Sequence, residues 1–123
     1  MIVKALKSKI HRATVTEADL NYVGSISIDK HLMDAANLLS YEQVQVLNLT
    51  NGNRLDTYVI EALENSGKIC VNGAAAHLIN PMDLVIIVSY CSINHSDLLT
   101  FNPSIVHVNE KNQIIDIKKT SPV

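Results

Sequence analysis

The chain has 123 residues, of which 47% are hydrophobic, and a formal net charge of −2 at pH 7. This length supports one hydrophobic core and is too short for two ordinary domains, so we expect a single domain over residues 1–123. The lack of a basic charge excess, with one Phe, four Tyr and no Trp, argues against nucleic acid as a partner.

Export and membrane attachment are not indicated either. Lys4, Lys7 and Lys9 interrupt the N-terminal residues, and the longest apolar run, at residues 84–88, is too short to cross a bilayer. Cys70 and Cys91 lie in apolar stretches and are expected to be buried thiols, with no disulfide suggested. We therefore expect a cytoplasmic protein without a membrane partner.

Short strands dominate the expected secondary structure. Residue alternation, β-branched side chains and turn signals predict seven strands, at residues 2–15, 43–49, 54–60, 68–71, 84–91, 104–108 and 113–118. Asn51-Gly52 predicts a hairpin between the second and third of these. Seven short strands favour a mainly β protein, either a small barrel or a sandwich.

One helix is predicted with a defined start. Asp29 is a suitable N-cap, and Leu32, Ala35, Ala36 and Leu39 would share one face of the helix that follows. A second short helix is expected at about residues 95–99.

Metal and nucleotide sites are not predicted. The five histidines have no spacing typical of metal ligands and no cysteine pair nearby, so no metal is expected. The four glycines are isolated from one another, which excludes the usual glycine-rich phosphate loops.

The N-terminal segment is basic. In a regular strand, Lys7 and Lys9 would share a face with Ala5 and His11, and this face would present cations to a small anion. The alternative is an ordinary solvated strand face.

Gly24-Ser25 is a candidate reactive bond. A serine that follows a flexible glycine can attack the preceding carbonyl, if the backbone is held strained and the oxyanion is stabilised. The same dipeptide is also common in ordinary turns.

Two further segments carry polar groups suited to such chemistry. Arg54 can bind a carboxylate through two parallel hydrogen bonds, and Tyr58 can deliver a proton. Asn72-Gly73 opens a small-residue loop whose backbone N–H groups are accessible to an anion.

Together these segments resemble one family, the pyruvoyl-dependent aspartate 1-decarboxylases. The matching segments, in order, are KIHR at 9–12, ADLNYVGS at 18–25, TNG at 50–52, Arg54, TY at 57–58 and NGAAAH at 72–77. The resemblance covers residues 1–88, and nothing diagnostic follows residue 93. Val23 stands where some members have an acidic residue, and Leu47 where an aromatic one is frequent.

The resemblance implies a precursor that cleaves itself. Ser25 Oγ attacks the Gly24 carbonyl, the resulting ester undergoes β-elimination, and hydrolysis with loss of ammonia leaves a pyruvoyl group at position 25. The products are chains 1–24 and 25–123. In the family Thr57 contacts the Gly24 carbonyl during this step, and Asn72 belongs to the same neighbourhood. Whether a maturation protein assists stays open.

The mature activity implied is decarboxylation of L-aspartate to β-alanine, for pantothenate and coenzyme A biosynthesis. The covalent pyruvoyl group forms a Schiff base with the substrate, so neither pyridoxal phosphate nor metal is needed. Tyr58 is the implied proton donor. The implied substrate-binding residues are Lys9, Arg54, Thr57, Gly73, Ala74 and Ala75, and His11 and Tyr22 line the site. Arg54 is assigned, as a hypothesis, to the side-chain carboxylate of aspartate, because a tightly held leaving carboxylate would raise the barrier.

The architecture implied is a homotetramer of six-stranded double-psi β-barrels with active sites between subunits. Thr57 and Tyr58 on one regular strand would face opposite sides, so they enter one pocket only if the backbone is irregular or the pocket draws on two subunits. The shared site of the family corresponds to the second case. Two alternatives stay open: a non-catalytic β-barrel binding module, and a pyruvoyl decarboxylase of another acidic amino acid.

Overall fold

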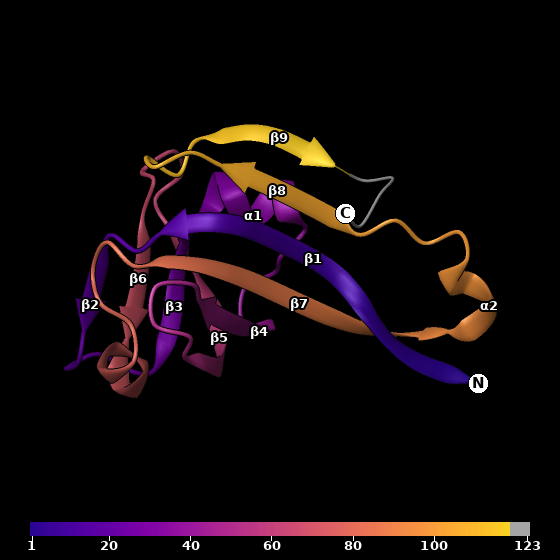
Figure 1. The fold of residues 1–123 in the computed structure, drawn as a ribbon, viewed down its shortest axis with the longest axis horizontal. Coiled ribbons are helices and arrows are strands. Elements are labelled where there is room, and N and C mark those ends of the chain that lie inside the picture. The colour runs from indigo at the N-terminus through magenta and orange to yellow at the C-terminus, as the bar shows by residue number, and fades with distance from the viewer. Residues whose placement is uncertain (119–123) are drawn as a thin grey trace.

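A computed structural model describes residues 1–118 (Figure 1). The strands are β1 (Ile2–Thr14), β2 (Glu17–Asp19), β3 (Ser25–Asp29), β4 (Gln43–Asn48), β5 (Arg54–Ala62), β6 (Ile69–Asn72), β7 (Leu84–Asn94), β8 (Ser104–Val108) and β9 (Ile114–Lys118). The helices are α1 (Lys30–Ala36), the 3-10 helix η1 (Gly73–His77) and α2 (His95–Leu98). All seven predicted strands are present, and the expected class, a mainly β, small double-psi β-barrel with short helices, is confirmed.

The strands form one mixed sheet in the order β2-β6-β3-β5-β4-β7-β1-β8-β9. Three neighbouring pairs are parallel, namely β1 with β8, β2 with β6, and β3 with β5. The predicted hairpin is confirmed, because β4 and β5 pair antiparallel on either side of Asn51-Gly52. Figure 1 shows the long β1 and β7 side by side, with α2 at their far end near the N-terminus.

Two strands were not predicted. β2 has only three residues and pairs with β6 alone. β3 alternates Ser and Ile, which is itself a strand signal, but it is five residues long and lies between Gly24 and a helix cap. All of its residues are buried. β3 is central to the site because it begins at Ser25.

The helix prediction was right at its start and wrong at its end. The Asp29 carboxylate accepts a hydrogen bond from the His31 N–H at 2.8 Å, which confirms the predicted N-cap. The helix ends at Ala36 because Asn37 adopts a left-handed conformation with φ of 58°. Leu39 therefore lies beyond the helix and is 68% exposed rather than buried on its face.

The hydrophobic core is enclosed by the curved sheet, and α1 adds Leu32, Met33 and Ala36 to it. Its largest fully buried side chains include Ile10, Ile26, Ile28, Leu32, Val44, Val46, Ile69 and Ile87. Because these come from strands across the whole sheet, one core fixes the relative positions of all of them. Within residues 1–118 no helix is long and apolar enough to span a membrane.

Candidate active site

Ser25 is held from two sides at the start of β3. Its Oγ accepts a hydrogen bond from Asn72 Nδ2 at 3.0 Å and donates one to the Val23 carbonyl at 3.3 Å. Ser25 is 1% exposed, and its backbone pairs with Asn72 in the antiparallel register of β3 and β6. The structure therefore brings together Ser25 and Asn72, which the sequence analysis placed in one neighbourhood.

Gly73 brings the η1 segment against the Gly24 backbone. It has φ of 73°, and a Cβ added there would lie 2.7 Å from Gly24 Cα and 2.8 Å from Gly24 N. Gly24 itself is exposed, with no atom within 4 Å of a Cβ built on it. The Gly24–Ser25 bond thus has the Gly73 backbone close to it on one side and free space at Gly24 on the other.

The small-residue loop predicted after Asn72 is a single turn of 3-10 helix. It spans Gly73–His77, with Gly73 and Ala76 buried. Ala74 is exposed and Ala75 is half-buried against the core. The turn therefore presents little side chain beside the Gly24-Ser25 bond.

Thr57 and Tyr58 leave β5 on opposite sides, as the sequence predicts for a regular strand. Thr57 pairs with Val44, whose side chain is in the core, and Tyr58 pairs with Gln43. Ile26 and Val59 are paired in β3 and β5, so their preceding residues, Ser25 and Tyr58, are neighbours on the side away from the core. Gly24 lies just before β3. If the β3–β5 register is extended back to this residue, Gly24 is the neighbour of Thr57. Within residues 1–118 no hydrogen bond joins Thr57 to Gly24.

Lys9 lies on the same sheet face as Arg54 and Tyr58, but several strands away. Lys9 pairs with Val88, Val88 with Gln45, and Gln45 with Asp56, so these four side chains share a face. Arg54 and Tyr58, each two residues from Asp56 on β5, share that face too.

The strand order sets the separation of these groups within one chain. Three inter-strand steps separate β1 from β5, and four separate β1 from β3. At the usual inter-strand spacing these steps amount to about 14 Å and about 19 Å along the sheet. Among residues 1–118 no hydrogen bond joins Lys9 to Ser25, whose side-chain partners are Asn72 and Val23.

The expected ribbon containing both Lys7 and Lys9 is wrong. The β1–β7 register shifts between Leu6 and Ser8, so Lys7 is an extra residue that breaks the alternation. Lys7 Nζ forms an ion pair with Glu42 at 2.7 Å, and Ser89 Oγ donates to the same carboxylate. Lys7 thus belongs to an internal polar network of the fold. Of these two lysines, only Lys9 stays a candidate for binding the substrate.

His11 packs edge-to-face against His107, with ring centroids 5.1 Å apart. Burial lowers the pKa of His11, and the positive charges of Lys9, His107 and Arg12 lower it further. His11 Nδ1 and His107 Nε2 are buried without a hydrogen-bond partner among residues 1–118. We call the region around Lys9 on β1 and Arg54 on β5 the cationic side of the sheet. Leu47 pairs with Arg54, and His11 is two residues from Lys9 on β1, so both lie on the cationic side rather than beside Ser25.

Tyr22 is 54% exposed and contributes to a cavity of about 320 Å³ on the β6 side of Ser25. The cavity is lined by Glu17, Asp19, Tyr22, Ser27, Ile60, Glu61, Ala62, Leu63, Lys68, Cys70 and Asn72. Tyr22 therefore lies near the Ser25 cluster and not near Lys9.

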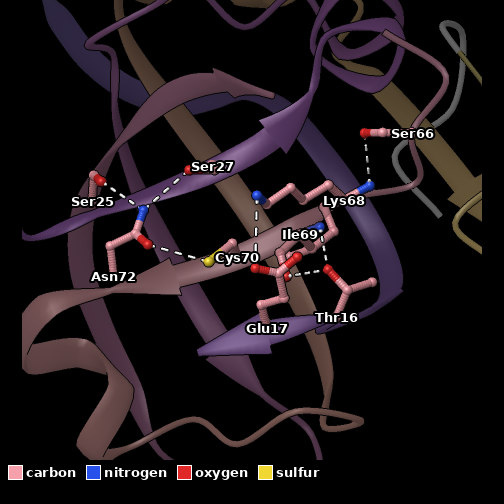
Figure 2. Close-up of polar contacts among 9 residues, drawn as sticks. All are labelled: Thr16, Glu17, Ser25, Ser27, Ser66, Lys68, Ile69, Cys70 and Asn72. Atoms are coloured by element: carbon pink, nitrogen blue, oxygen red, sulfur yellow. Dashed lines mark hydrogen bonds and ion pairs between the residues drawn. The ribbon is translucent and has the colours of Figure 1, made fainter. Parts of the chain in front are cut away.

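Sequence reasoning missed two members of this cluster, Ser27 and Cys70. Asn72 Nδ2 also donates to Ser27 Oγ at 3.0 Å, and Cys70 Sγ lies 3.2 Å from Asn72 Oδ1 (Figure 2). A sequence signal for these two residues exists. Residues two apart share one face of a strand, which places Ser27 with Ser25 and Cys70 with Asn72. Both cysteines are free thiols; Cys70 is buried as expected, whereas Cys91 is only half-buried.

No group of three or more His, Cys, Asp or Glu side chains arranged to hold a metal ion occurs within residues 1–118. The groups that surround Ser25 are instead amide, hydroxyl, thiol and backbone.

Comparison with known proteins gives a consistent result. The sequence model of a family described as Aspartate decarboxylase matches residues 1–115. An aspartate 1-decarboxylase from Acetivibrio thermocellus is 57% identical over 118 residues, covering 96% of this chain and 94% of the relative. An aspartate 1-decarboxylase from Clostridium botulinum (strain Loch Maree / Type A3) is 58% identical over 114 residues, with 93% and 90% covered. One from Pelotomaculum thermopropionicum is 52% identical over 119 residues, with 97% and 90% covered.

Proposed function

Because this chain belongs to the aspartate decarboxylase family, we propose that it converts L-aspartate to β-alanine and carbon dioxide. It is then a carboxy-lyase that serves pantothenate biosynthesis in the cytoplasm. Relatives named aspartate 1-decarboxylase align with more than nine-tenths of this chain, and the family model spans residues 1–115, which include every candidate site residue. The observation that carries the active-site assignment is the Asn72 Nδ2 to Ser25 Oγ hydrogen bond at 3.0 Å.

We propose that the chain cleaves itself between Gly24 and Ser25. Ser25 Oγ bonds to the Gly24 carbonyl carbon as the Gly24–Ser25 C–N bond breaks, and the hydroxyl proton passes to the released nitrogen of residue 25, which gives an ester and a free amino group. Asn72 holds Oγ in place, and Gly73 holds the Gly24 backbone close to it. Thr57, next to Gly24 when the strand register is continued, is our candidate for the hydrogen bond to the Gly24 carbonyl.

The surroundings of Ser25 fit a pyruvoyl group made in place from this residue. The side chain is buried beside an amide donor, and the space beside Gly24 is open enough for the chain to separate there. When present, this group supplies a ketone that accepts the electrons left by the departing carboxylate. Asn72 and the η1 backbone would hold it.

The chain's own residues then bind the substrate and move a proton. We assign Tyr58, on the Ser25 side of β5, as the proton donor to the substrate α-carbon. Arg54 binds the side-chain carboxylate of aspartate and Lys9 supplies the second positive charge, while the exposed Ala74 and the η1 backbone line the pocket. His11 and Tyr22 line its edges.

The strand positions of Lys9 and Ser25 support an assembly with shared active sites. Both lie on the outer face of the sheet, and four inter-strand steps separate β1 from β3, about 19 Å when followed along the sheet. We therefore propose that a neighbouring copy supplies Lys9 to each Ser25, in the homotetramer that the family resemblance implies.

Intact mass of the purified chain tests self-cleavage. We expect a fragment ending at Gly24 and a second fragment lighter than a serine-started chain by one ammonia, whereas Ser25→Ala stays whole. A wild-type chain that stays whole after prolonged warming indicates either a required maturation protein, tested by adding cell extract, or a non-catalytic module.

Carbon dioxide release tests the substrate. We expect release from aspartate well above that from glutamate or cysteate, and none from the Ser25→Ala variant. Equal rates with all three acids would contradict the assignment to aspartate.

A further inference from the structure

Asn72 is the centre of the polar cluster around Ser25. Its side-chain NH₂ donates to the hydroxyls of both Ser25 and Ser27, each at 3.0 Å, and its carbonyl oxygen faces Cys70 Sγ at 3.2 Å. Figure 2 shows the amide between β3, which carries the two serines, and the thiol of its own strand. Within residues 1–118, the side-chain hydrogen bonds of the amide thus all come from these three residues.

Ser27 does not determine which way this amide points, because its hydroxyl can satisfy either the NH₂ or the carbonyl oxygen of Asn72. Ser25 favours the NH₂ only through its 3.3 Å hydrogen bond to the Val23 carbonyl, because a hydroxyl that gives up this bond can donate to a flipped amide instead. Cys70 does distinguish the two orientations. In the structure Sγ lies 3.2 Å from the carbonyl oxygen, so the S–H, a weak donor, points at a strong acceptor, whereas a flipped amide would present NH₂ to sulfur, a weak acceptor.

The surroundings keep Cys70 protonated and therefore able to donate. Burial raises the pKa of the thiol, the nearby carboxylates of Glu17 and Asp19 raise it further, and Lys68 acts in the opposite direction. Lys68 is itself paired with Glu17 at 3.7 Å.

A fixed orientation matters here because the cluster borders an open space. Ser27, Cys70 and Asn72 all line the cavity of about 320 Å³ described above, although Asn72 itself is only 3% exposed, so the edge of the cluster borders solvent. Water, like Ser27, can bond to either end of an amide and gives it no preferred orientation.

We propose that Cys70 is a positioning residue for self-cleavage: its S–H holds the Asn72 amide with the NH₂ toward Ser25 Oγ. This role rests on the proposed function, because it concerns the Gly24–Ser25 bond. Cys70 touches neither the breaking bond nor the nucleophile and acts only through Asn72.

The first test compares cleavage rates of freshly synthesised full-length chains. Cys70→Ala removes the donor, and we expect cleavage to slow about three- to ten-fold, the cost of one lost hydrogen bond. Cys70→Ser restores a donor of similar size, and its rate should return to within about two-fold of wild type. Cys91→Ala, at the other cysteine, is the matched control and should cleave at the wild-type rate. Thermal unfolding midpoints of the wild type and the three variants are measured to check that each chain is folded.

The second test does not need cleavage. In an uncleaved Ser25→Ala background, solvent exchange of the Asn72 side-chain NH₂, measured by NMR, should rise several-fold with Cys70→Ala and fall back with Cys70→Ser. Unchanged exchange in Cys70→Ala, unchanged cleavage in that variant, or no rescue by Cys70→Ser would overturn the proposal. If the wild-type chain itself does not cleave, self-cleavage as proposed fails, and the exchange result alone still decides whether Cys70 orients Asn72.

Discussion

The Ser25 cluster and the cationic side of the sheet differ in how complete they are within one chain. Around Ser25, the side chains of Ser25, Ser27, Cys70 and Asn72 all hydrogen-bond within the same chain, and Ser25 and Asn72 are almost fully buried. On the cationic side, Lys9 and Arg54 are on strands three steps apart, and two imidazole nitrogens of His11 and His107 are buried without partners among residues 1–118.

This difference separates two tasks. The residues that we propose act on the Gly24–Ser25 bond are held in place by hydrogen bonds within the chain, so self-cleavage as proposed depends on local geometry. The residues that we propose recognise the dicarboxylate lie on strands three steps apart, so turnover as proposed depends on assembly. Variants should therefore fall into two groups, one that changes cleavage and one that changes turnover.

Tyr58→Phe should give the largest change on the turnover side. Loss of a general acid lowers turnover about 100- to 10,000-fold. Self-cleavage should continue, because the groups around the Gly24–Ser25 bond are unchanged. The two rates are measured by carbon dioxide release and by intact mass. Loss of self-cleavage in Tyr58→Phe would contradict the division between residues for self-cleavage and residues for turnover.

Gly73→Ala should give the largest change on the cleavage side. The new Cβ would lie 2.7 Å from Gly24 Cα, so the Gly24 backbone must move. Misplacement of reacting groups by about 1 Å costs on the order of 100-fold in rate. Gly52→Ala is the matched control, because Gly52 also has a positive φ, of 80°, but open space around it. Gly52→Ala should cost about 1 kcal/mol in stability and leave cleavage unchanged.

Arg54→Lys keeps the charge and loses the paired geometry. We expect aspartate turnover to fall roughly ten- to a hundred-fold, the cost of one charge-assisted hydrogen bond. Cleavage should proceed at the wild-type rate. Equal losses in both rates would contradict a role restricted to the substrate.

Glu42→Gln should affect stability alone. Burial raises the pKa of the Glu42 carboxyl, but hydrogen bonds from Lys7, Ser89 and the Leu39 N–H outweigh it, and the pKa in the folded chain is lowered. Wild-type stability from this group is therefore present above its unfolded pKa and is lost as the pH falls through the folded pKa.

Urea unfolding between pH 7 and pH 3 measures this effect. Glu42→Gln should lower the free energy of unfolding by about 1 kcal/mol at pH 7, and its difference from wild type should shrink toward pH 3. A difference that is constant over this range would show that Glu42 ionisation is not linked to folding.

Local signals in the sequence predicted the local features of the fold. The Asn51-Gly52 hairpin and the Asp29 cap depend on residues close together in the chain, and both were predicted correctly. The extra residue at Lys7 was not predictable, because its partner Glu42 is 35 residues away. Leu39 was misplaced because the left-handed Asn37, which ends the helix, has no strong signal of its own.

The candidate site was predictable to a similar extent. Family motifs identified Ser25, Asn72 and Gly73, but Cys70 and Ser27 join them only because β3 and β6 pair in one particular register. The register depends on packing of the whole sheet around the core and is not encoded near either residue. For the same reason, the distance from Lys9 to Ser25 became known only with the strand order.

Co-assembly of two inactive variants tests the division of tasks most directly. Lys9→Ala should cleave itself but turn over little aspartate, and Ser25→Ala should stay whole and turn over none. When the two are co-expressed and native mass shows mixed oligomers, we predict that aspartate decarboxylation returns, because Lys9 of one chain then serves Ser25 of another. Mixed oligomers that stay as inactive as their parents would contradict an active site shared between chains.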